Sequence, residues 1–190
     1  MSKIWAMFFL SVSLFGVSCQ PDYAPKPRGF QRFVFPAKTY KNYNNDCGFS
    51  CQIPTYATVL PDFSVNNQKC WVNVFYSPYN ATLHLSYNPI SSIKQLHKFS
   101  EDARVLVYKH TVKADEIFET YIEKDNLNGM VYELSGNTAT NFQFYVTDSS
   151  KHYLRGALYF NAQTNQDSIL PVLNFLKQDI MYMLKTIEWK

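Results

Sequence analysis

The densest group of chemically capable side chains lies at residues 108–115, which read YKHTVKAD. A carboxylate that fixes the tautomer of an imidazole can make it a general base, so His110 and Asp115 are candidates for a polar site. The alternative is a helix C-terminus, where the cationic side chains of Lys109, His110 and Lys113 interact favourably with the helix dipole. We favour the helix end, or a surface that binds a partner, over a catalytic site.

Arg155 is a second candidate, because it begins the segment RGALYFN beside a glycine. Arginine binds carboxylates through parallel N–H donors, so Arg155 could hold a carboxylate of a ligand or partner. It could equally pair inside the protein with Asp148 or Glu133. The candidate interaction surface therefore consists of Lys109, His110, Asp115 and Arg155.

Motifs for common chemistries are missing from the sequence, which has no GxSxG, HExxH, P-loop or GxGxxG pattern. A net charge of +3 is too small to indicate nucleic-acid binding. We therefore expect no catalytic residues, no cofactor, no metal site and no nucleic-acid partner.

The first 18 residues indicate export. One positive charge precedes a short apolar stretch over residues 4–17, which is too short to span a membrane and is typical of a signal peptide. Ser18 directly precedes Cys19, as in a bacterial lipoprotein processing site, where the cysteine becomes the lipidated N-terminus. The alternative is an ordinary signal peptide cut near Cys19.

These features divide the chain into three parts. We expect a signal peptide over residues 1–18, a lipidated tether over 19–29 and a single α+β periplasmic domain over 30–190. The tether contains three prolines and no apolar periodicity, which favours an extended spacer. Acyl chains would then hold the protein on a membrane without a spanning segment.

Three cysteines remain after Cys19 is lipidated, so one disulfide and one free thiol are expected in an oxidising compartment. A bond between Cys47 and Cys70 would close a loop of about two dozen residues and contribute about 3 kcal/mol. A bond between Cys47 and Cys51 needs a sharp turn, because an extended five-residue segment spans about 13 Å. A zinc site would need a further paired motif that the sequence lacks.

Hydrophobic periodicity predicts two main helices, over residues 91–113 and 168–187. In the first, we expect Ile93, Leu96, Ala103, Leu106, Val107 and His110 to face inward. Alternation predicts strands over residues 30–35, 56–60, 70–76, 81–87, 116–123, 129–135, 141–147 and 153–160. Residues 38–51, rich in Asn, Tyr and Lys, are expected to form a loop. Trp189, one residue from the end, indicates a docked C-terminus.

This order of elements predicts an α+β fold with a mainly antiparallel sheet flanked by two main helices. It is similar, at the level of fold, to PsbP/Mog1-like α/β/α sandwiches. A fold of this kind does not define a function.

Eight segments, in order along the chain, resemble the gliding motility lipoprotein GldD family of the Bacteroidetes. They are Cys19, PKPRG (25–29), Cys47 with Phe49-Ser50, Cys70-Trp71, HLSY (84–87), YKHTVKAD (108–115), RGALYFN (155–161) and EWK (188–190). The resemblance spans essentially the whole mature chain. Cys51 stands where an aromatic residue is usual in the family, which supports a disulfide between Cys47 and Cys70.

The resemblance implies a non-enzymatic component of the machinery for gliding motility and the associated type IX protein secretion. Its partners would be other envelope lipoproteins and membrane components of that machinery. It would be lipid-anchored in the cell envelope and face the periplasm. The alternative function is that of a periplasmic lipoprotein that binds a small ligand or a lipid.

Overall fold

The computed structural model describes residues 33–44, 46–62, 70–161 and 166–190. The chain divides into two units, Met1–Phe30 and Gln31–Lys190, and the description below concerns the second. Cys19, the tether and residues 30–32 lie outside the described residues. No helix in the described ranges is long and apolar enough to cross a membrane.

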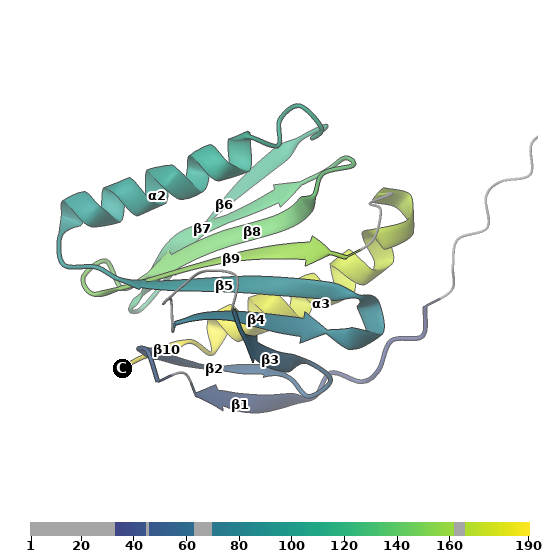
Figure 1. Cartoon of the computed structure of the whole chain (residues 1–190), viewed down its shortest axis with the longest axis horizontal. Coiled ribbons are helices and arrows are strands. Elements are labelled where there is room, and N and C mark those ends of the chain that lie inside the picture. Colours follow the sequence, from purple (N-terminus) through teal and green to yellow (C-terminus); the bar gives the residue numbers. More distant parts are fainter. Residues whose placement is uncertain (1–32, 45, 63–69, 162–165) are drawn as a thin grey trace, which may run out of the picture. The chain divides into compact units, whose positions relative to one another are not determined.

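Ten strands and two long helices make up the described part of the chain (Figure 1). The elements are β1 (Tyr40–Asn44), β2 (Phe49–Pro54), β3 (Thr58–Pro61), β4 (Trp71–Tyr76), the short 3-10 helix η2 (Ser77–Tyr79), β5 (Ala81–Pro89), α2 (Ile93–Tyr108), β6 (Ile117–Lys124), β7 (Leu127–Leu134), β8 (Thr140–Thr147), β9 (His152–Phe160), α3 (Gln166–Lys185) and β10 (Glu188–Trp189).

Seven strands form one sheet in the order β3-β4-β5-β9-β8-β7-β6. Every neighbouring pair in it is antiparallel. The register between β5 and β9 pairs Leu83 with Leu158 and His84 with Ala157. Since side chains alternate between the faces of a strand, each register position assigns a row of residues to one face.

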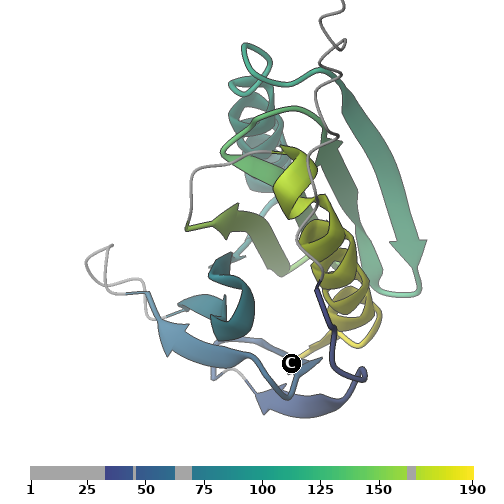
Figure 2. The ribbon, with the colours of Figure 1, turned by 90° about the vertical axis from the view of Figure 1, so that its right-hand side faces the viewer.

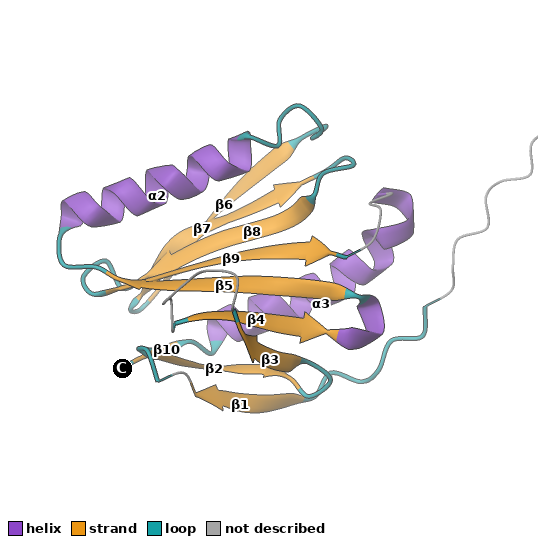
Figure 3. Cartoon of the chain, in the orientation of Figure 1, coloured by secondary structure: helices purple, strands orange, loops and turns teal. Residues whose placement is uncertain are grey.

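The two helices cover opposite faces of this sheet (Figure 3). Tyr153 of β9 packs with Leu96 of α2 in one buried cluster. The next residue, Leu154, belongs to the main core together with Leu176 and Ile180 of α3. The prediction of an α+β fold with a mainly antiparallel sheet between two main helices is therefore confirmed.

A second, three-stranded sheet in the order β1-β2-β10 was not predicted. Residues 38–51 were expected to form a loop, and this was wrong, because they contain β1 and the start of β2. β1 is an edge strand whose side chains are exposed or partly buried. Backbone pairing with β2 holds it in place, so it needs no apolar alternation. The small sheet lies beside the C-terminal part of α3 (Figure 2).

The strand expected over residues 30–35 is also corrected, because the described part, residues 33–35, has no regular structure. The aromatic alternation there has another cause. The ring centroids of Phe33 and Phe35 lie 5.9 Å apart, and Phe35 stacks on Phe175 of α3 at 4.3 Å. Phe35 thus packs on a helix rather than beside a paired strand.

The helix expected over residues 91–113 ends at Tyr108, and turns follow. Leu96, Ala103 and Val107 are buried as predicted. Ile93 and Leu106 were expected to face inward, but they are 61% and 39% exposed. The buried stripe of α2 is therefore narrower than a periodicity count suggests.

Candidate interaction site

The segment singled out in the sequence lies where α2 ends and the chain turns toward β6. Ser92 caps the N-terminus of α2, where its hydroxyl accepts a hydrogen bond from the Gln95 N–H at 3.3 Å. After Tyr108, the backbone carbonyl of His110 accepts from the N–H groups of Lys113 and Ala114, both at 2.9 Å. These turns present consecutive polar side chains beside the loop between β7 and β8.

A hollow of about 300 Å³ lies at this place. Its lining residues are Lys109, His110, Val112, Lys113, Asn137 and Ala139. We call it the cationic hollow, because two lysines and no acidic residue line it. Burial and the nearby charge of Arg155 lower the pKa of His110, so its imidazole is uncharged at neutral pH.

Asp115 is exposed and lies beside the cationic hollow. Its N–H donates to the Ser135 carbonyl at 3.1 Å, and its carboxylate lies close to Gly136. None of the hydrogen bonds among the described residues joins Asp115 to His110. The arrangement in which Asp115 orients His110 as a base is therefore not formed.

Arg155 lies on β9 with its side chain on the face that α2 packs against. Its Nη2 donates to Oε1 of Gln143 on the neighbouring strand β8, at 2.6 Å. Neither internal partner named from the sequence is used. Glu133 forms an ion pair with Lys177 instead, and Asp148 accepts hydrogen bonds from its own turn.

Of the four surface residues selected from the sequence, the structure brings Lys109 and His110 together and places Arg155 within electrostatic reach of His110. Gln143 was missed by the sequence analysis. It contacts Arg155 only because β8 and β9 pair in a register that sets Gln143 opposite Ala157. Nothing in the sequence near Gln143 indicates that register.

A disulfide joins Cys47 to Cys70, and Cys51 is a buried free thiol. Burial raises the pKa of the Cys51 thiol to about 12. The thiol is therefore protonated at neutral pH and unsuited to act as a nucleophile or metal ligand.

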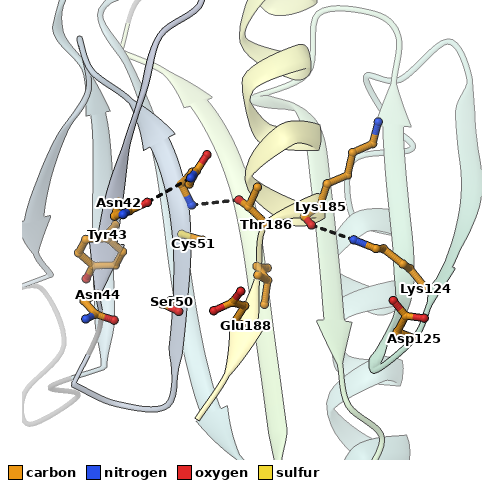
Figure 4. A pocket seen from close by; sticks show the side chains of 12 residues that line it. Asn42, Tyr43, Asn44, Ser50, Cys51, Lys124, Asp125, Lys185, Thr186 and Glu188 are labelled. Carbon is orange, nitrogen blue, oxygen red and sulfur yellow. Dashed lines mark hydrogen bonds between the residues drawn. The ribbon is translucent and has the colours of Figure 1, made fainter.

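A second hollow, of about 780 Å³, lies between the small sheet and the turn that joins β6 to β7 (Figure 4). On one side, the Gln52 side chain donates to Asn42 at 3.1 Å and the Gln52 N–H donates to the Thr186 hydroxyl at 3.0 Å. On the other, the Lys124 ammonium donates to the Lys185 carbonyl at 3.1 Å. Amides, hydroxyls and charged groups thus form most of its walls, which suits a polar occupant better than an acyl chain.

The layered arrangement defines the structural class, a PsbP-like α/β/α sandwich. The solution structure of cyanobacterial PsbP (CyanoP) from Synechocystis sp. PCC 6803 superposes with a TM-score of 0.51 at 10% sequence identity. The match covers 85% of this chain and 98% of the other. At that identity the likeness concerns the fold alone. No curated protein matches the sequence.

The family follows from the sequence profile of the gliding motility lipoprotein GldD, which matches residues 20–189. The chain belongs to this family, and the predicted family is confirmed. It is a gliding motility lipoprotein, and membership of a lipoprotein family implies anchoring to a membrane through lipid.

Proposed function

We propose that this protein is a membrane-anchored component required for gliding motility and for the associated type IX protein secretion, and that it acts through protein contacts rather than catalysis. Cys19 carries the lipid, and the domain faces the periplasm. The partners are other envelope lipoproteins and membrane components of the same machinery.

The family match is the observation that carries this proposal, because it begins one residue after Cys19 and continues to Trp189. The match therefore includes the cationic hollow, Arg155 and the docked C-terminus. Partly exposed polar sites of this kind, on a rigid sheet and helix scaffold, are suited to positioning a partner.

Replacement of Cys19 tests the role of the anchor. The gene is deleted in the native host and restored as wild type, as Cys19→Ala or as the matched control Ser18→Ala, which keeps the cysteine and a small residue before it. Colony spreading and the profile of secreted proteins are scored in each strain. Immunoblots of whole cells establish that the variants accumulate, and blots of membrane and soluble fractions establish where they are.

We expect deletion to abolish both spreading and secretion, and we expect wild type and Ser18→Ala to restore them. Cys19→Ala should accumulate without a lipid and restore neither. Normal spreading and secretion in the deletion strain would overturn the proposed function. Full rescue by Cys19→Ala would leave the family role intact and overturn the need for the anchor.

A further inference from the structure

Arg155 holds a positive charge in the sheet without a carboxylate beside it. The ion pairs formed by the described residues are Lys38–Asp179 and Lys177–Glu133, and neither includes Arg155. Its side chain is partly buried, and its one side-chain hydrogen bond in the described chain is to the neutral amide of Gln143. A charge removed from water without a counter-charge is unfavourable, so this arrangement has an energetic cost.

Next to Arg155, the side-chain amide of Gln143 has N–H groups without an acceptor. Gln143 is 1% exposed, and its Oε1 accepts from Arg155 at 2.6 Å. Its Nε2 has no hydrogen-bond partner. Most buried amide groups in proteins are bonded, so an unpartnered N–H beside an uncompensated guanidinium is unusual. The single oxygen and single nitrogen of a carboxamide are bonded to the same carbon, so the unpartnered Nε2 of Gln143 lies near the guanidinium that its Oε1 accepts from.

The surroundings favour an anion with a flat shape. Side chains alternate along β9, so Tyr153, two residues before Arg155, and Tyr159, four residues after it, lie on the same face as Arg155. The register with β8 sets Tyr145 directly opposite Arg155. Two lysines line the cationic hollow together with His110, whose pKa the charge of Arg155 helps to lower. Two adjacent groups of N–H donors on a face with aromatic residues match the two oxygens of a carboxylate.

We propose that Arg155 and Gln143 form a carboxylate-binding site. The carboxylate belongs either to a partner polypeptide, as an acidic side chain or a chain end, or to a small free acid. The polypeptide case rests on the proposed function, since it supplies a contact through which the protein acts. The binding chemistry itself does not depend on that function.

Benzoate is the probe for the site, and benzamide, which has the same shape without the charge, is its control. Binding to the full-length lipoprotein in detergent is measured by calorimetry and by the shift in unfolding temperature. We expect benzoate, and not benzamide, to bind and to raise the unfolding temperature. Loss of charge-assisted hydrogen bonds in the variant R155M/Q143L should weaken benzoate binding by about tenfold or more.

The same double variant separates binding from a structural role. It removes the uncompensated charge and the unpartnered amide together and fills their volume with apolar side chains. Without probe, we expect it to unfold at the wild-type temperature or above it. The variant R155K, which keeps the charge and loses the planar fork, provides a second protein in which benzoate should bind more weakly.

Equal binding of benzoate and benzamide, or unchanged benzoate binding in R155M/Q143L and R155K, would overturn the proposal. If benzoate binds as expected, two further measurements distinguish the two sources of the carboxylate. Preference for a peptide with a free terminal carboxylate over its amidated form assigns a polypeptide. A small acid retained in native mass spectra of wild type, and lost in R155M/Q143L, assigns a free acid. If the deletion strain spreads normally while the purified wild-type protein binds benzoate as expected, only the proposed function is contradicted.

Discussion

The ammonium of Lys38 lies 2.7 Å from the carboxylate of Asp179, a residue of α3 that is fully buried. The same ammonium donates to the Phe175 carbonyl at 2.7 Å and lies 3.3 Å from the centre of the Phe175 ring. The hydroxyls of Tyr40 and Tyr56 also donate to Asp179. The buried carboxylate of Asp179 thus binds Lys38 and links the segment before β1 to α3.

The substitution Lys38→Met should destabilise the protein, because it leaves the Asp179 carboxylate without its cation. The Lys38 side chain is 26% exposed, so we expect a loss of about 2 kcal/mol, less than for a fully buried pair. Chemical denaturation measures the change. Lys94→Met, at an exposed position on α2, is the matched control and should change stability by less than about 0.5 kcal/mol. Equal stability of the two variants would contradict this role of Lys38.

Trp189 should be needed for docking of the C-terminus. Its ring lies parallel to that of His152, with centroids 5.2 Å apart, and its Nε1 donates to the Asn126 carbonyl at 2.9 Å. Trp189→Ala should cost about 3 kcal/mol, and Trp189→Phe, which keeps a stacked ring, about 1 kcal/mol. Thermal unfolding of both variants measures the order. A Phe variant as unstable as the Ala variant would show that stacking on His152 contributes little.

Thiol labelling should distinguish the cysteines of the lipidated protein. Cys47 and Cys70 are joined, and Cys51 is 4% exposed with its pKa raised to about 12 by burial. We expect iodoacetamide to label no cysteine in the native protein and Cys51 alone after denaturation without reductant. Mass spectrometry of peptides locates the label. Rapid native labelling of Cys51 would contradict its burial.

The double variant C47A/C70A should lose about 3 kcal/mol of stability.

Asp148 should make stability depend on pH in the acid range. Burial alone would raise the pKa of its carboxyl, but hydrogen bonds from the His152 N–H, the Ser150 hydroxyl and the Lys151 N–H lower it to about 2. A lowered folded-state pKa stabilises the protein above the unfolded pKa of about 4, and this stabilisation is lost as the pH falls toward about 2.

Asp148→Asn should therefore be less stable than wild type by about 1–2 kcal/mol at neutral pH. The difference should shrink between about pH 4 and pH 2, because the wild-type carboxyl becomes neutral there. Denaturant unfolding of both proteins at a series of pH values measures it. A difference that stays constant over that range would contradict the ionised carboxylate as its source.

The sequence determined the elements that bury one or both faces in the main sheet. Strands expected over residues 70–76, 81–87, 129–135, 141–147 and 153–160 occur at nearly those places, as does the C-terminal helix. Their apolar periodicity is strong because each packs on a helix or on the core, and burial selects apolar residues at fixed spacing. The family was likewise readable from short segments in order.

Only the tertiary structure decided which distant residues meet. β1 was missed because an exposed edge strand is held by backbone pairing, which leaves little trace in side-chain pattern. Lys38 and Asp179 are 141 residues apart, and Arg155 reaches Gln143 through the pairing of β8 with β9. Such contacts depend on strand register and on how helices pack across the sheet. Those are set by the sum of many weak contacts over the whole chain, so no local pattern at either residue encodes them.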